Sequence, residues 1–80
     1  MHILHVEDNA TDAELVIRAI QRGAPDNTID TATDLQQARE LLINHQRFDL
    51  ALIDLGLPDG SGLELVAEIR ERELPLAVVV

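Results

Sequence analysis

Hydrophobic and polar residues follow one another along this chain in blocks that switch between two periodicities. Short apolar runs at 3–6 and 76–80, and a longer one at 48–55, are bounded by polar or turn-forming residues, which is typical of buried strands. Residues 28–32 form a weaker run with two threonines, which predicts a strand at a sheet edge. The pattern therefore predicts four strands.

Three stretches between these runs carry apolar residues at the spacing of one buried helix stripe. The stripes consist of Ala13, Val16, Ile17 and Ile20; of Leu35, Ala38, Leu41 and Leu42; and of Leu65, Val66 and Ile69. Asn9 or Thr11 is expected to cap the first helix. Gly23, followed by Pro25, supplies its stop. Residues 33–36 predict a capping box for the second helix.

The elements alternate in the order βαβαβαβ, which indicates an α/β domain with a parallel sheet and helices packed on it. Two exposed ion pairs are expected four residues apart on the helices, Glu14–Arg18 and Glu68–Arg72. Residues 56–62 are rich in Gly, Pro and Asp and predict a loop.

Composition and charge narrow the class of protein. Eighty residues make one small domain, which buries only about 60–65% of its unfolded surface. The net charge of −9 argues against a nucleic-acid or anionic-membrane surface, and the absence of cysteine excludes disulfides and thiolate metal sites. No apolar run approaches the roughly 18 residues of a membrane span, and the first residues lack the basic start of a signal peptide. We expect a cytoplasmic protein.

Three acidic residues lie at the carboxyl ends of predicted strands, where parallel sheets bind their ligands. Glu7 and Asp8 follow the first strand, and Asp54 ends the third. If those strands are neighbours, the three carboxylates converge, and their repulsion raises at least one pKa unless a divalent cation relieves it. Ligands that are all oxygen point to Mg2+. Each acid taken alone could equally be a solvated loop entry or a helix cap.

Two stretches carry a resemblance to a known family. Residues 3–9 read ILHVEDN, and residues 48–62 read FDLALIDLGLPDGSG. The second stretch has an aspartate, Asp54, then Pro58 four residues on and Gly62 eight residues on. Together the stretches resemble the receiver domain of two-component response regulators. The resemblance covers 1–80, about the N-terminal two-thirds of such a domain.

The resemblance implies a fold, a reaction and a set of site residues. The fold would be a flavodoxin-like, doubly wound parallel sheet of strand order 2-1-3-4, without the last strand and the last two helices. Asp54 would accept a phosphoryl group from a sensor histidine kinase or a phosphotransfer protein. Mg2+ would be bound by Asp8 directly, by Glu7 directly or through water, by Asp54, and by the backbone carbonyl of Gly56. Pro58 and Gly62 would shape the loop around the acceptor, with Gly62 meeting a positive φ or a close backbone approach.

The sequence also departs from the family pattern. The family has a Ser or Thr after its fourth strand and a Lys after its fifth, whereas this chain has no hydroxyl residue after Ser61 and no lysine. With one helix over four strands on one face and an open fourth-strand edge, the chain is expected either to self-associate through that face and edge or to be a shortened form of a longer protein. The departures favour an alternative function, a receiver-like interaction or dimerisation module without efficient phosphorylation.

A third possibility is a phosphohydrolase of the haloacid-dehalogenase type, which needs a second Asp two residues after the nucleophile. Gly56 occupies that position, so this function ranks last. Among the histidines, His5 is expected to be a core residue with a satisfied partner, and His2 and His45 to be surface residues. Residues 59–62 are expected to form a plain turn, because no Gly-Lys-Ser/Thr follows.

Overall fold

The structure is a computed structural model that describes residues 1–44 and 47–80. His45, which is predicted to be a surface residue, lies outside the described residues. The elements in chain order are β1 (His2–Val6), α1 (Ala10–Gly23), β2 (Thr28–Ala32), α2 (Leu35–Ile43), β3 (Leu50–Ile53), β4 (Gly56–Leu57), β5 (Gly60–Ser61), α3 (Gly62–Glu71) and β6 (Ala77–Val79).

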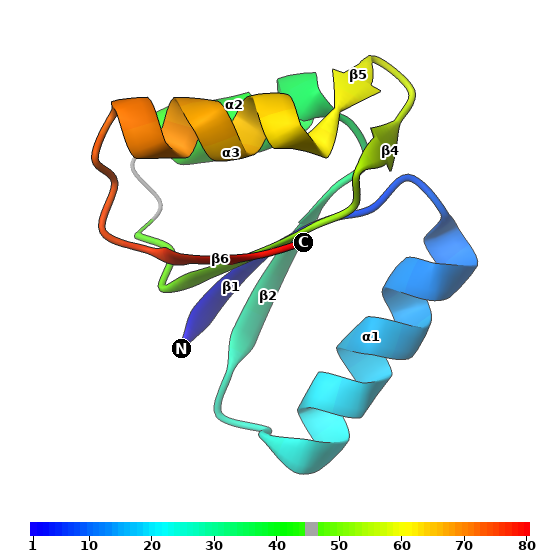
Figure 1. Cartoon of the computed structure of the whole chain (residues 1–80). Coiled ribbons are helices and arrows are strands. Elements are labelled where there is room, and N and C mark those ends of the chain that lie inside the picture. Colours follow the sequence, from blue (N-terminus) through cyan, green and yellow to red (C-terminus); the bar gives the residue numbers. More distant parts are fainter. Residues whose placement is uncertain (45–46) are drawn as a thin grey trace.

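Four strands form one parallel sheet in the order β2-β1-β3-β6, and β4 pairs with β5 in a separate antiparallel hairpin. Because β6 is the fourth strand of the main sheet, the predicted order 2-1-3-4 is confirmed. Helix α1 covers one face of the sheet, and α2 and α3 lie together on the other (Figure 1). This is the expected flavodoxin-like, doubly wound arrangement, with β2 at the expected edge.

The main core lies between the sheet and the layer of α2 and α3. Alternate residues of a strand point to opposite faces, so Leu4 and Val6 of β1 enter this core while His5 lies on the side of α1. The buried members of the core are Leu4, Val6, Ala32, Leu35, Ala38, Phe48, Ala51, Ile53, Leu65 and Ile69. Burial of these aliphatic side chains holds the sheet against α2 and α3.

The helices begin at side chains that satisfy their first backbone N–H groups. Asn9 caps α1, as one of the two predicted residues, and its Oδ1 accepts from the N–H of Asp12 at 2.9 Å. The capping box predicted at 33–36 is wrong. The N-cap of α2 is Asp34, and the Gln37 side chain accepts from the Thr33 N–H at 2.9 Å. Asp34 has the extended backbone of an N-cap, and its Oδ1 accepts from the N–H of Gln37 at 2.8 Å, so the helix starts one residue later than expected.

Three further expectations are corrected by the structure. The third strand spans Leu50–Ile53 and not 48–55, because the chain turns at both ends of the buried run. The loop expected at 56–62 contains the β4–β5 hairpin. Glu68 does not form the expected pair with Arg72. It binds Arg39 of α2 instead, with the Nε of Arg39 2.9 Å from Oε1, and so links the two helices.

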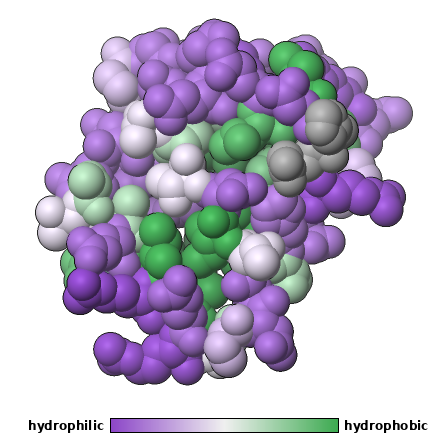
Figure 2. All heavy atoms as spheres, turned by 180° about the vertical axis from the view of Figure 1, so that it is seen from behind, coloured by the Kyte–Doolittle hydropathy of each residue, from purple (hydrophilic) through white to green (hydrophobic). Residues whose placement is uncertain are grey.

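The surface is mostly hydrophilic when the molecule is seen from behind, and hydrophobic residues are visible between its upper and lower parts (Figure 2). Among the described residues, Val79 of the edge strand β6 is 52% exposed. Self-association through this edge and the α1 face stays a prediction. No helix in the described part of the chain combines the length and the apolar character needed to cross a membrane.

The packing of α3 predicts the effect of one core substitution. Leu65 is fully buried and Leu63, on the same helix, is 57% exposed. We expect Leu65→Ala to lower the free energy of unfolding by about 2–5 kcal/mol, because it leaves a cavity against the sheet. Leu63→Ala should change it by less than about 0.5 kcal/mol. Urea denaturation followed by circular dichroism measures both, and equal effects would contradict this core assignment.

Candidate functional site

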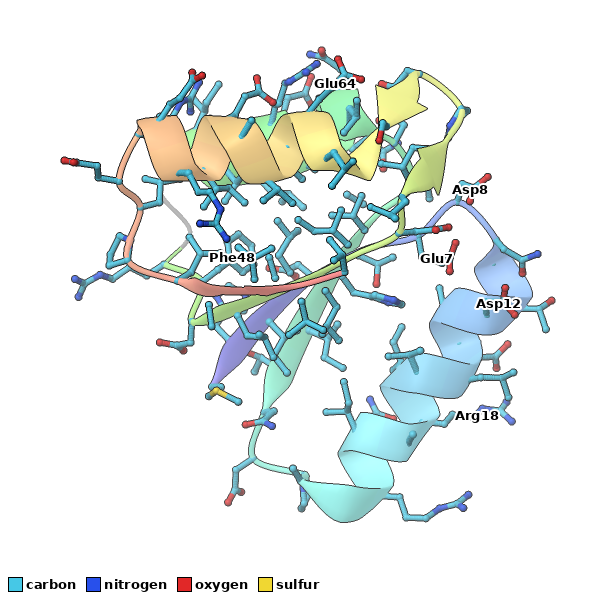
Figure 3. All side chains as sticks on the ribbon, viewed as in Figure 1. Glu7, Asp8, Asp12, Arg18, Phe48 and Glu64 are labelled. Atoms are coloured by element: carbon cyan, nitrogen blue, oxygen red, sulfur yellow. The ribbon has the colours of Figure 1, made fainter. Side chains whose placement is uncertain are left out.

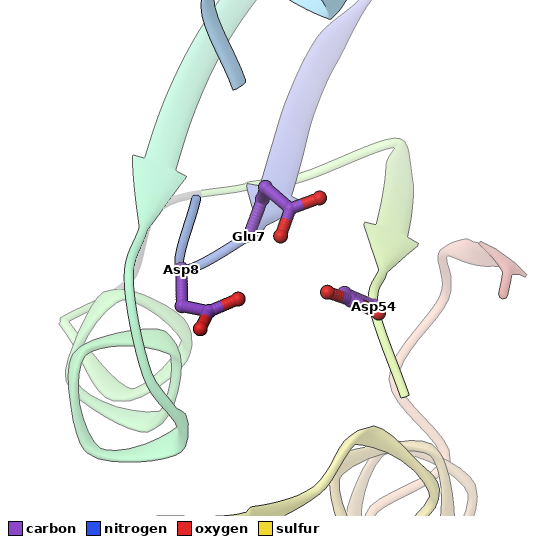
Figure 4. A group of neighbouring side chains, drawn as sticks. All are labelled: Glu7, Asp8 and Asp54. Atoms are coloured by element: carbon purple, nitrogen blue, oxygen red, sulfur yellow. The ribbon is translucent and has the colours of Figure 1, made fainter. Parts of the chain in front are cut away.

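The three acids singled out in the sequence converge at one end of the sheet (Figure 4). One carboxylate oxygen from each of Glu7, Asp8 and Asp54 can be chosen such that all three lie within 4.8 Å of one another. The pairing of β1 with β3 brings them together. Val6 is the register partner of Ile53, and the N–H of Asp54 donates to the Val6 carbonyl at 3.0 Å. The residues that follow these two partners therefore leave the sheet side by side.

The backbone around the acids is fixed on both sides. The N–H of Glu7 donates to the carbonyl of Ala32 in β2 at 2.9 Å, so β1 stays paired on both edges up to the first acid. Asp8 is exposed, at the turn that leads from β1 into α1, and Figure 3 shows Glu7 and Asp8 together above the first turn of that helix. The site is thus an open, acidic end of a rigid sheet.

The electrostatics of the cluster are unfavourable for three ionised carboxylates. Partial loss of hydration raises the pKa of Glu7 above its ordinary value, and the neighbouring Asp54 and Asp8 carboxylates raise it further. The N–H of Asn9 opposes this shift by donating to the Glu7 Oε2 at 3.3 Å. The pKa of one acid is therefore raised, as expected, and desolvation is the largest single cause.

Asp54 is held by the chain that follows it. The backbone N–H of Gly56 donates to the Asp54 Oδ1 at 3.2 Å, which limits the rotation of the carboxylate. Gly56 begins the hairpin, directly beside the cluster. Its carbonyl as a metal ligand stays a prediction.

Gly62 is needed because the backbone of Asp54 passes very close to it. A Cβ at this position would lie 2.2 Å from the Asp54 carbonyl oxygen and 2.7 Å from Cγ2 of Ile53. The Gly62 N–H also donates to the Leu55 carbonyl at 3.0 Å. Of the two reasons considered for this glycine, the close approach is therefore the correct one.

Two histidines behave differently from their predictions. His5 is buried, as expected, but its Nδ1 has no hydrogen-bond partner among the described residues, so the satisfied partner is not found. Burial lowers the pKa of His5, and the Asp54 carboxylate partly opposes this. His2 is not a plain surface residue. Its Nε2 lies 2.7 Å from the Asp30 Oδ2, and its ring centroid lies 4.3 Å from that of Phe48.

The chemistry of the three acids fits a hard divalent cation. All side-chain donors of the cluster are carboxylate oxygens, the ligands that Mg2+ prefers. The pKa of Glu7 is raised by desolvation and by the two neighbouring carboxylates, and a bound cation would favour the ionised form of all three acids. Glu7, Asp8 and Asp54 are the residues that could hold such an ion.

Comparison with known proteins identifies the family. Residues 3–80 match the model of the response regulator receiver domain. The chain therefore belongs to the response regulator receiver domains, which act in two-component signal transduction.

Relatives and solved structures agree with this assignment. The transcriptional regulatory protein PhoP of Escherichia coli O157:H7 is 35% identical over 80 residues, which are all of this chain and 34% of that protein. The chain thus spans about a third of the length of this relative. Virulence transcriptional regulatory protein PhoP of Salmonella typhimurium (strain LT2) has the same identity and coverage.

Among solved structures, response regulator TrrA from Thermotoga maritima in complex with Mg2+-BeF has a TM-score of 0.88 at 29% identity. That match covers 99% of this chain and 66% of TrrA. The MaeR response regulator bound to beryllium trifluoride has a TM-score of 0.91 at 24% identity, over 99% of this chain and 64% of that one. This second likeness concerns the fold alone.

The close approach at Gly62 predicts the effect of an alanine there. We expect Gly62→Ala to destabilise the chain by about 1–3 kcal/mol, because the new methyl group forces the Asp54 backbone aside. Gly23→Ala is the matched control. It also lies in a helix, has nothing within 4 Å of the added Cβ, and should stabilise the chain by about 0.5–1 kcal/mol. Urea denaturation measures both changes, and a neutral Gly62→Ala would contradict the steric argument.

The raised pKa of Glu7 predicts a pH and metal dependence of stability. The folded chain holds this proton more tightly than the unfolded chain, so the contribution of Glu7 to stability is lost as the pH rises through its raised pKa. At neutral pH, Glu7→Gln should therefore raise the melting temperature of the metal-free chain. Mg2+ at about 100 times its Kd should stabilise the wild type by about 2.7 kcal/mol and the variant much less.

The control for this comparison is Glu71→Gln, which removes the same charge from an exposed position at the end of α3. It should leave both the pH dependence and the Mg2+ effect unchanged. Thermal melts between pH 4 and 8, with and without Mg2+, report all three chains. Identical behaviour of the two variants would contradict the expected role of Glu7 as a ligand of Mg2+.

Proposed function

We propose that this chain is the phosphoacceptor module of a two-component system. It takes a phosphoryl group from the phosphohistidine of a sensor histidine kinase, or of a phosphotransfer protein, onto Asp54. Mg2+ is held by Glu7, Asp8, Asp54 and the Gly56 carbonyl. The observation that carries the proposal is the convergence of the three carboxylates within 4.8 Å at the end of β1 and β3.

The reaction is a nucleophilic substitution at phosphorus. One oxygen of the Asp54 carboxylate forms the new P–O bond while the P–N bond of the phosphohistidine breaks, and its electron pair stays on the departing imidazole nitrogen. When bound, Mg2+ supplies positive charge that offsets the carboxylates and the phosphoryl oxygens. Positioning and charge thus account for the rate.

The residues of this chain contribute mainly by holding Asp54 still. Its backbone is fixed by the hydrogen bond to Val6, and its carboxylate by the N–H of Gly56. The open position of the cluster leaves room for a partner that carries the phosphohistidine. Asp8 is exposed, and Glu7 and Asp54 are only partly buried.

The partner is inferred from a relative. A solved complex of histidine kinase ThkA with response regulator TrrA matches this chain with a TM-score of 0.83 at 30% identity, over 96% of this chain and 64% of the matched one. Since the fold is shared with that response regulator, a histidine kinase is the partner class that we propose here as well.

Labelling with an acyl phosphate tests the proposal. The wild-type chain, incubated with acetyl phosphate and Mg2+, should gain the mass of one phosphoryl group, and Asp54→Asn should gain none. Chelation of Mg2+ should slow the labelling roughly a hundredfold or more, because metal charge stabilisation is worth several kcal/mol. Mass spectrometry of the intact chain measures the label.

Asp49→Asn is the matched control, because Asp49 stands just before the opposite end of the same strand. Its labelling should equal that of the wild type. Label that persists in Asp54→Asn would disprove the acceptor assignment. No label on any chain would favour the alternative, a receiver-like interaction module that works without phosphorylation.

A further inference from the structure

Asp59 lies in the turn of the hairpin that follows the acceptor, and its side chain reaches a helix 24 residues earlier in the sequence. Its Oδ1 accepts from the N–H of Leu35 at 2.8 Å, and its Oδ2 from the N–H of Gln36 at 3.1 Å. Both donors belong to the first turn of α2. The carboxylate therefore bridges the acceptor loop and a helix of the neighbouring βα unit.

These two bonds complete the N-terminus of α2. The first four N–H groups of a helix have no partner within the helix. In α2, Asp59 accepts from the first two, the Asp34 side chain accepts from Gln37 at 2.8 Å, and the Asp34 carbonyl accepts from Ala38 at 3.2 Å. The backbone N–H groups, that of Leu35 foremost, lower the pKa of Asp59, so its carboxylate is ionised at neutral pH.

The other end of the hairpin adjoins the acceptor. Gly56 pairs with Ser61, and the Gly56 N–H donates to the Asp54 carboxylate. The turn also packs on α2. Gly60 has a φ of +151°, and a Cβ there would lie 2.8 Å from Cδ1 of Leu35. A hairpin with only two register pairs is not stable by itself. Its position therefore depends on its contacts with the rest of the chain, among them the hydrogen bonds of Asp59 to α2.

We infer that Asp59 is a positioning residue of the phosphoacceptor site, whose tether to α2 fixes the hairpin and with it Gly56 beside Asp54. The inference rests on the proposed function, because it gives the tether a role in metal binding and phosphorylation. Loss of the tether lets the hairpin move, so the Gly56 N–H holds the Asp54 carboxylate less firmly. The Gly56 carbonyl is then less often in position to bind the cation.

The test compares two carboxylates that cap the same helix. Asp59→Ala removes the tether, and Asp34→Ala removes the other cap but leaves the hairpin tied. We expect Asp59→Ala to weaken Mg2+ binding roughly tenfold, as for other groups that support a metal ligand. Asp34→Ala should leave the affinity unchanged, and Asp59→Asn, which keeps one acceptor oxygen, should lie between. Calorimetric titration with Mg2+ measures the affinities.

Acetyl phosphate labelling separates positioning from general damage. At saturating Mg2+ the labelling rate of Asp59→Ala should return to within about twofold of the wild type, since the acceptor itself is intact. A purely structural role predicts that both alanine variants lose affinity to the same degree, and that result would overturn the inference. Unchanged Mg2+ affinity in Asp59→Ala would overturn it as well.

Amide hydrogen exchange of the metal-free chains keeps the two proposals apart. Asp59→Ala should speed the exchange of the Gly56 and Gly62 amides, whereas Asp34→Ala should speed only that of α2. If the wild type binds no Mg2+, the proposed function fails, yet this comparison still decides the tether. Equal protection of both glycine amides in the wild type and Asp59→Ala would then reject it.

Discussion

The parallel pairing of β1 with β3 is the contact on which the site depends. The register sets Val6 opposite Ile53, and the backbone N–H of Asp54 donates the last hydrogen bond between the two strands, to the Val6 carbonyl. A shift of one residue would turn the buried side chains of β3 to the other face and carry Asp54 away from Glu7. The same burial that stabilises the fold therefore places the acids together.

That placement opposes stability in the metal-free chain. Three carboxylates share one end of the sheet, and the pKa of Glu7 is raised, first by desolvation and then by the neighbouring carboxylates. Gly62 is also required by the site, because only a residue without a side chain lets α3 start against the Asp54 backbone. Like-charged groups gathered at one point are typical of functional sites, while the core beneath follows ordinary packing.

Much of the fold follows from the order of residues alone. Apolar runs and helical stripes are local signals, so they predict the strands, the helices and the cap at Asn9. The acids were found because strand ends can be read from the same pattern. The cap at Asp34, the Arg39–Glu68 pair and the His2–Asp30 pair were missed, because two of them join residues 28 or 29 positions apart and the first depends on one backbone turn.

The sequence by itself determined that this is an α/β receiver with Glu7, Asp8 and Asp54 at its strand ends, since hydrophobic periodicity and short motifs are written along the chain. Only the tertiary structure decided what surrounds these acids. The hairpin after Asp54, the contact of Gly62 with the acceptor backbone and the tether from Asp59 to α2 arise when distant segments pack together. Such contacts depend on the relative placement of elements, which no local pattern specifies.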